Sequence, residues 1–223
     1  MKIYLYADSH LKHEKMQTYC QRPPNFSEIT HRNMMNTLKP EDTLIHLGDV
    51  GINKFEDWGW MIPLWPGRKI LIRGNHDRQH SNTWWMEKGG FDFACDGLKF
   101  RSMWLTHEPS TSLADGCELN IHGHLHNIWH GFSSPERVER DKKLLGADFM
   151  RRLKNPWQRL FAAEYTGYMP VEFDKFISNP DKYQARGPIG TVTVQSAEYY
   201  KQLTGKDYLG CSDVKFEYGD EEK

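Results

Sequence analysis

Five short polar motifs each follow an apolar, strand-like segment, and this repeated pattern limits the fold of the chain more than any other feature. The motifs are Asp8-Ser9-His10, Gly48-Asp49, Gly74-Asn75-His76-Asp77, His107 and Gly123-His124-Leu125-His126. The segments before them are residues 3–6, 44–47, 69–72, 103–105 and 119–121. In α/β folds, polar sites form beyond the carboxyl ends of the strands. The pattern therefore predicts an α/β fold with one polar site at the strand ends.

The spacing within the motifs is typical of metal ligands. Side chains two residues apart in an extended segment project to the same side, so Asp8 and His10 can bind one cation together. The same argument applies to His124 and His126. Asp49 is a single carboxylate at a strand end, and its two oxygens can bridge a pair of cations.

These residues supply enough ligands for two metal ions. With an amide oxygen from Asn75 and a further imidazole from His107, two sites of roughly four ligands each result if Asp49 is shared. Two divalent ions about 3.5–4 Å apart can hold a phosphoryl group and generate a nucleophile. Imidazole-rich ligand sets favour transition metals over Mg²⁺. We expect two divalent ions, with Mn²⁺ first and Fe, Zn or Ni as alternatives.

The order of these motifs resembles that of the calcineurin-like metallophosphoesterase superfamily. The resemblance implies two facing mixed β-sheets flanked by helices. It also implies a first metal held by Asp8, His10, Asp49 and His126, and a second held by Asp49, Asn75, His107 and His124. His76 is then the catalytic residue, which protonates the leaving group or stabilises the phosphoryl transition state while a metal-bridging hydroxide attacks phosphorus.

A narrower resemblance links the chain to small bacterial and phage metallophosphoesterases. It rests on the Arg-Pro segment at Arg22-Pro23 and on the Tyr-x-Pro-Val segment at 168–171. Lys12 replaces the glycine that is usual after Asp-x-His, and a longer stretch follows Gly-His-Leu-His. The substrate preference of these proteins therefore does not transfer directly to this chain.

Length and composition predict one catalytic domain spanning residues 1–223, with an insert at about 127–158 and a C-terminal extension from about 175. The sequence has no run of eighteen apolar residues, and a charged motif follows soon after the N-terminus, so we expect neither a membrane span nor a secretory signal. Its four cysteines form no Cys-x-x-Cys pair and are typical of reduced thiols in a cytoplasmic protein.

The net charge of −1 excludes nucleic-acid binding that relies on an overall positive charge of the protein. Residues 137–159 nevertheless hold eight Lys or Arg against three acids. This basic run is interpreted either as a solvated helix face or as an arm that holds a polyanionic substrate near the metals.

The apolar patterns predict alternating strands and helices. The expected strands are 2–7, 43–47, 69–72, 91–95, 99–106, 118–122, 159–165 and 189–195. The expected helices are 27–38, 54–65, 81–88, 171–178 and 196–204. Asp96-Gly97 indicates a hairpin turn between two of the strands.

Further residues are expected near the site. His13 and Arg22 are predicted substrate contacts, the latter because a guanidinium matches phosphate oxygens. Asp77 is expected to fix its own loop, and His46 to be buried with a hydrogen bond. Cys20 is expected to have a structural role rather than to bind metal.

These patterns predict a metal-dependent phosphoric ester hydrolase. We expect a phosphodiesterase acting on nucleotides or other small phosphodiesters. A protein Ser/Thr phosphatase is disfavoured, because the Asp-Arg-Gly stretch of those enzymes does not follow Gly48-Asp49. A nuclease, a small-molecule phosphomonoesterase and a non-catalytic scaffold are the alternatives. The expected partner is therefore a phosphate ester, with nucleotides or nucleic acid among the candidates, and the sequence does not specify the oligomeric state.

Overall fold

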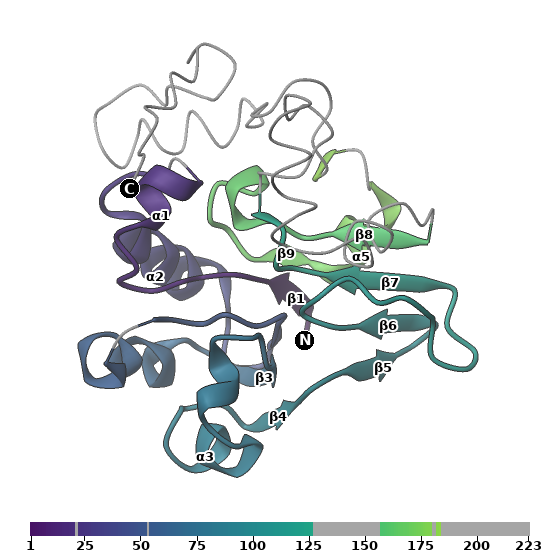
Figure 1. The fold of residues 1–223 in the computed structure, drawn as a ribbon, viewed down its shortest axis with the longest axis horizontal. Coiled ribbons are helices and arrows are strands. Elements are labelled where there is room, and N and C mark those ends of the chain that lie inside the picture. Colours follow the sequence, from purple (N-terminus) through teal and green to yellow (C-terminus); the bar gives the residue numbers. More distant parts are fainter. Residues whose placement is uncertain (21, 53, 127–156, 180–181, 184–223) are drawn as a thin grey trace, which may run out of the picture.

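The computed structural model describes residues 1–20, 22–52, 54–126, 157–179 and 182–183. It contains a five-stranded sheet in the order β4-β3-β2-β1-β9 and a four-stranded sheet in the order β5-β6-β7-β8. Figure 1 shows the strands of the two sheets side by side with helices around them. The predicted α/β fold with two mixed sheets is confirmed.

The first sheet carries the first three motifs. Its parallel strands are β1 (Ile3–Tyr6), β2 (Thr43–His46), β3 (Arg68–Ile72) and β4 (Phe93–Cys95), and β9 (Val171–Glu172) is antiparallel to β1. Leu5, Leu44 and Leu71 are fully buried in it. Parallel strands covered on both faces are rich in apolar residues, which explains the continuous apolar runs before the motifs.

The second sheet carries the remaining motifs. Its strands are β5 (Leu98–Phe100), β6 (Met103–Leu105), β7 (Leu119–His122) and β8 (Gln158–Leu160). β5 is antiparallel to β6, whereas β6, β7 and β8 run parallel. Because β6 and β7 are parallel neighbours, the residues that follow them, His107 and 123–126, emerge at the same edge.

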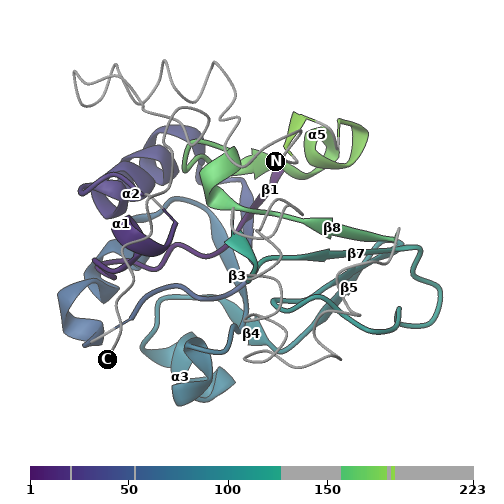
Figure 2. The same ribbon diagram turned by 45° about the horizontal axis from the view of Figure 1, so that its top comes forward.

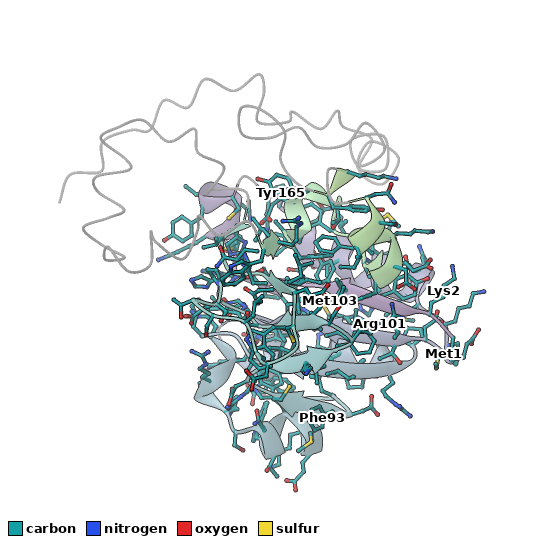
Figure 3. All side chains as sticks on the ribbon, turned by 90° about the vertical axis from the view of Figure 1, so that its right-hand side faces the viewer. Met1, Lys2, Phe93, Arg101, Met103 and Tyr165 are labelled. Carbon is teal, nitrogen blue, oxygen red and sulfur yellow. The ribbon has the colours of Figure 1, made fainter. Side chains whose placement is uncertain are left out.

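Helices cover the first sheet on the side away from the second. α1 (Met16–Tyr19), α2 (Phe26–Thr37) and α3 (Asn82–Glu87) lie on the left in Figures 1 and 2, and the second sheet lies on the right. α5 (Phe173–Ser178) packs against β1 and β9. Figure 3 shows side chains filling the interior between these elements, with Met1 and Lys2 at the periphery.

One local prediction is wrong, and two are right only in part. The 54–65 segment forms two 3-10 helices, η1 (Phe55–Asp57) and η2 (Gly59–Leu64), and η2 contains Pro63, which has no N–H for an α-helical bond. The Asp96-Gly97 pair is not a hairpin turn, because β4 and β5 belong to different sheets. The turn instead interrupts the predicted 99–106 strand at Arg101-Ser102, where Arg101 has a φ of 54°.

Two predictions near the C-terminal end are partly wrong. The predicted 159–165 strand ends at Leu160, and η5 (Ala163–Tyr165) follows it. The predicted 171–178 helix begins two residues later, because Val171 and Glu172 pair with β1.

Several predictions fall outside the described residues. They are most of the 127–158 insert, the basic run apart from 157–159, the 189–195 strand and the 196–204 helix. The predicted domain bounds remain a prediction. Among the described residues, no helix has both the length and the apolar character that a bilayer span requires.

Candidate metal centre

The motif loops contain an unusual concentration of left-handed backbone. Five of the predicted ligands have positive φ angles: Asp8 at 54°, His10 at 44°, Asp49 at 55°, His124 at 70° and His126 at 50°. Residues other than glycine adopt this conformation rarely, and such positions cluster at functional sites. The strand ends are therefore shaped to direct these side chains rather than to continue the sheets.

Backbone hydrogen bonds join the motif loops to one another. The Asp8 N–H donates to the Gly48 carbonyl at 2.9 Å, and the His10 N–H donates to the Asp49 carbonyl at 3.0 Å. The two sheets are joined where the His124 N–H donates to Asp8 Oδ2 at 2.9 Å. These bonds hold motifs that are far apart in sequence within a single site.

Four predicted ligands surround one point at this junction, forming what we call the first group. His10 Nε2 lies 3.9 Å from Asp8 Oδ1 and 3.5 Å from Asp49 Oδ2. His126 Nε2 lies 3.7 Å from Asp8 Oδ1. Among the described residues, neither ring nitrogen of His10 has a hydrogen-bond partner, although the side chain is buried. A buried polar group without a partner is unfavourable, and a metal ion would satisfy it.

The second group lies beside the first and shares Asp49. His107 Nε2 is 3.3 Å from Asp49 Oδ2, 3.1 Å from Asn75 Oδ1 and 3.0 Å from His124 Nδ1. His107 Nδ1 lies 2.8 Å from the Leu47 carbonyl oxygen, which can only accept, so Nδ1 carries the proton. In a neutral His107, the lone pair of Nε2 therefore points at the oxygens of Asp49 and Asn75. A cation between these atoms removes the repulsion.

Both groups fit the size of a transition-metal ion. Metal–ligand bonds of about 2.1 Å place neighbouring ligand atoms about 3.0 Å apart in octahedral and about 3.4 Å apart in tetrahedral geometry. The separations in the two groups, 3.0–3.9 Å, lie at or slightly above these values. Asp8-His10-His126 and Asp49-His107-His124 are both sets of side chains that could hold a metal ion.

Charges in the site are strongly coupled. Although burial opposes ionisation of Asp49, the neighbouring imidazoles of His107, His10 and His76 hold its pKa well below the usual range. Burial disfavours charged His107, but the Asp49 carboxylate raises the pKa of His107 to about 9. A proton occupies the second group when no metal is bound, and metal binding has to displace it.

His76 lies at the open side of both groups. Its Nε2 is 3.9 Å from Asp49 Oδ2, and 44% of the side chain is exposed. The His76 N–H donates to Asp49 Oδ1 at 3.0 Å, which fixes the backbone while the ring faces solvent. The side chain is therefore accessible to a molecule bound at the two groups.

Asp77 holds the loop, as the sequence predicts. Its buried carboxylate accepts hydrogen bonds from the N–H groups of Asp49 at 2.7 Å, Val50 at 3.0 Å and Gly74 at 2.8 Å. Gly74 has to be glycine, because a Cβ there would lie 2.1 Å from Asp49 Oδ1. The Gly-Asn-His-Asp motif thus positions the Asp49 loop as well as supplying its own polar groups.

The two predicted substrate contacts lie in different environments. His13 is half-buried beside His10, with ring centroids 5.6 Å apart. It lines an open depression with five other residues, Lys12, Glu14, Lys15, Ile52 and Asp57. This position agrees with the predicted substrate contact but does not test it.

Arg22 lies behind the site instead. Its side chain has 0% exposure, so the predicted contact with a substrate phosphate is not supported. Arg22 donates to Glu164 Oε1 from Nε at 2.9 Å and from Nη2 at 2.7 Å, and to the carbonyl oxygens of Ser9 and Asp8 at 2.9 and 2.7 Å. Its hydrogen bonds go to the protein interior rather than toward the depression.

Glu164 was not singled out from the sequence. Its Oε1 lies 3.2 Å from His126 Nδ1, and the guanidinium of Arg22, outweighing burial, lowers the pKa of Glu164 to about 2. One feature of the sequence could have indicated a role for Glu164: it is the only charged residue in the apolar run 160–165. A charged residue in such a run is rarely buried unless it is paired.

Two further expectations concern buried polar residues. His46 is fully buried, with its Nε2 2.6 Å from Ser9 Oγ and its Nδ1 accepting from the Gly48 N–H at 3.1 Å, as predicted. Cys20 is a buried thiol close to His126 and Glu164. The structure therefore places Cys20 next to a predicted ligand, and its expected structural role remains a prediction.

Two mixed sheets with Asp–His clusters at their strand ends define an α/β protein with a candidate metal centre. Residues 1–185 match the family described as calcineurin-like phosphoesterase, and the chain belongs to this family. Membership of this family indicates a hydrolase whose relatives typically bind divalent metals.

One relative and one solved structure add to this comparison. The chain is 30% identical over 146 residues to an uncharacterized protein of Methanocaldococcus jannaschii, covering 61% of this chain and 77% of that protein. A crystal structure of a protein of unknown function from Aquifex aeolicus is similar with a TM-score of 0.55 and 23% identity. This match covers 79% of the chain and 98% of the Aquifex protein, and supports the fold alone.

Proposed function

We propose that the protein is a dinuclear metal-dependent phosphoesterase that acts on nucleotides or other small phosphodiesters. The observation that carries the proposal is the position of Asp49 Oδ2, which lies 3.5 Å from His10 Nε2 and 3.3 Å from His107 Nε2. One carboxylate oxygen thus faces ligand atoms of both groups, as a bridge between two cations requires.

The residues divide between two ions. Asp8, His10, Asp49 and His126 hold the first, and Asp49, Asn75, His107 and His124 hold the second. When bound, two such ions hold a phosphate oxygen and lower the pKa of water, which supplies a nucleophile at neutral pH. The imidazole-rich set favours Mn²⁺, Fe, Zn or Ni.

His76 serves as the catalytic residue at the open side of the centre. Its exposed ring can donate a proton to the leaving oxygen or stabilise charge on the phosphoryl group. The hydrogen bond from its N–H to Asp49 Oδ1 keeps it next to the bridging carboxylate. Proton donation to the alcohol is the step that a diester needs if its leaving group is a poor one.

The depression beside His13 receives the organic part of the substrate. Lys15 on its wall can attract an anionic group, while the Lys12 ammonium pairs with Glu28 and the wall also carries Glu14 and Asp57. His13, on the same wall, lies beside His10. The depression is open, which leaves room for a substituent on the phosphate. This arrangement supports a small phosphodiester rather than a phosphate buried in a closed cavity.

Paired assays test the proposal. Metal-stripped protein reconstituted with Mn²⁺ is assayed with bis-p-nitrophenyl phosphate and with p-nitrophenyl phosphate. We expect faster turnover of the diester, lost in Asp49→Ala and kept in Asp174→Asn, a control at an exposed carboxylate that pairs with Arg101. A preference for the monoester would indicate a phosphomonoesterase instead. Absence of turnover with two metals bound would contradict the proposed catalysis.

A further inference from the structure

A buried ion pair contacts the side of His126 that faces away from the first group. His126 Nε2 faces Asp8 Oδ1 at 3.7 Å, and on the opposite side of the ring Nδ1 faces Glu164 Oε1 at 3.2 Å and Arg22 Nη2 at 3.4 Å. Glu164 Oε1 also accepts two hydrogen bonds from Arg22. The side chains of Arg22 and Glu164 have exposures of 0% and 1%, so substrate does not contact either of them.

This contact determines which nitrogen of His126 is available to a metal. Arg22 Nη2 donates to Glu164 at 2.7 Å, much closer than its 3.4 Å to Nδ1, so the nearer partner of Nδ1 is the ionised carboxylate. A carboxylate can only accept a hydrogen bond, so Nδ1 carries the proton. The proton on Nδ1 leaves the lone pair of Nε2 directed at the first group. A carboxylate behind a metal-binding histidine also makes the imidazole a stronger ligand.

Arg22 connects the same pair to the other strand end of the site. Its guanidinium donates to the carbonyl oxygens of Asp8 and Ser9 at 2.7 and 2.9 Å. Asp8 and Ser9 follow β1 in the first sheet, whereas Glu164 follows β8 in the second. One ion pair therefore holds Asp8 and His126, which come from different sheets, in fixed relation to each other.

The second group is held in a different way. His107 Nδ1 is hydrogen-bonded to the Leu47 carbonyl, a backbone oxygen, and the Asp49 loop is held by Asp77. Neither contact involves Arg22 or Glu164. A change at the buried ion pair therefore acts directly on the first group and reaches the second only through the hydrogen bond from the His124 N–H to Asp8.

We propose that Arg22 and Glu164 are positioning residues for the first metal ion, which they hold through His126 and Asp8. The inference rests on the proposed dinuclear centre. Neither residue touches substrate or metal. Together they fix the ring orientation and the protonated nitrogen of His126, and they hold the Asp8 backbone in its left-handed conformation.

Metal titration of the full chain tests this inference without using activity. Metal-stripped wild type, Glu164→Ala, Glu164→Gln and Glu172→Ala are titrated with Mn²⁺ by calorimetry. Glu172 is the matched control, since it is a glutamate that pairs with Lys2 at the surface. We expect Glu164→Ala to weaken one of the two binding events by roughly 10–100-fold and to leave the other unchanged.

The glutamine variant separates positioning from general damage to the fold. The amide oxygen of Glu164→Gln can still accept from Arg22 and from His126, so we expect it to recover most of the lost affinity. Electron paramagnetic resonance of the loaded samples gives a second readout. We expect the spin-coupled signal of a Mn²⁺ pair in wild type, Glu164→Gln and Glu172→Ala, and the hyperfine pattern of isolated Mn²⁺ in Glu164→Ala.

Three results would overturn the inference: unchanged binding in Glu164→Ala, equal weakening of both events, or no recovery in Glu164→Gln. If the alanine variant does not fold, Arg22→Lys takes its place, because a lysine can contact Glu164 but cannot also reach both carbonyl oxygens. Unchanged affinity in Arg22→Lys would likewise reject the proposal. If the wild-type protein binds fewer than two ions, the dinuclear centre itself is contradicted. This outcome differs from the case in which the wild type binds two ions and the variants bind them equally well.

Discussion

His107 Nε2 and Asn75 Oδ1 lie 3.1 Å apart, although 32 residues separate them in the chain. Asn75 follows β3 in the first sheet, and His107 follows β6 in the second. Because Nδ1 of His107 donates to the Leu47 carbonyl, both facing atoms of a neutral pair carry lone pairs. The space between the two atoms is therefore filled either by a proton on Nε2, consistent with the raised pKa of His107, or by a metal ion that displaces this proton.

Removing the Asn75 amide tests the second metal site. We expect Asn75→Ala to weaken one Mn²⁺-binding event by at least roughly tenfold. Loss of a residue that only supports a metal ligand already lowers metal affinity by about this factor, and Asn75→Ala removes a ligand itself. Calorimetric titration measures the effect, with Asn179→Ala as a control at the exposed end of α5. Two unchanged binding events in Asn75→Ala would contradict its role as a ligand.

Removing the His76 imidazole tests the catalytic assignment. We expect His76→Ala to retain two bound metals and to lose roughly 10²–10⁴-fold in kcat on a diester with a poor alcohol leaving group, the usual range for a lost acid–base group. His80→Ala is the matched control, because His80 stacks on Trp84 with ring centroids 3.6 Å apart. If His76→Ala keeps full turnover with its metals in place, the catalytic role belongs to another group.

The sequence predicts the strands of the site and the residues at their ends well. Each motif follows an apolar run, and the two sheets place Asp8, Asp49, Asn75, His107 and His124 next to one another. This success has a physical cause, because strand direction and motif position together determine the edge at which a side chain emerges. The details of each loop, such as its positive φ angles, do not follow from the pattern.

The errors concern contacts that no local pattern encodes. The guanidinium of Arg22 could bind a phosphate. Its hydrogen bonds instead go to Glu164, 142 residues away in the chain, and to two backbone carbonyl oxygens inside the protein. Asp96-Gly97 has the composition of a hairpin turn, yet composition does not determine whether the next strand joins the same sheet. In the 54–65 segment, Gly59 and Pro63 favour short 3-10 turns over a continuous α-helix.

His46 makes the stability of the protein sensitive to acid. Burial lowers the pKa of His46 from 6.5 to about 3, so the unfolded chain binds a proton below pH 6.5 that the folded chain does not. The contribution of His46 to the free energy of unfolding is therefore complete above pH 6.5 and decreases as pH falls toward 3. We expect a loss from this group of about 1.4 kcal/mol between pH 7.5 and 5.5.

Urea unfolding of metal-free protein measures this loss, with a chelator present so that metal release does not contribute. The comparison is between wild type and His46→Gln, which has no titrating imidazole at this position. Between pH 7.5 and 5.5, we expect the free energy of unfolding to fall by about 1.4 kcal/mol less in His46→Gln than in wild type. Equal losses in the two proteins would show that protonation of His46 does not limit stability in this range.

The Arg22–Glu164 pair gives a prediction about stability in which the double variant is decisive. Removing one partner of a buried ion pair leaves an uncompensated charge and costs about 3–5 kcal/mol, whereas replacing both partners with apolar residues is often neutral. We expect Arg22→Met alone to lower the free energy of unfolding by that amount, and Arg22→Met with Glu164→Leu to regain much of it. Denaturant unfolding of metal-free protein measures both. If the double variant regains stability but its first metal site stays weak, the pair serves to position His126 rather than to stabilise the fold. If the double variant is no more stable than Arg22→Met, the pair serves the fold.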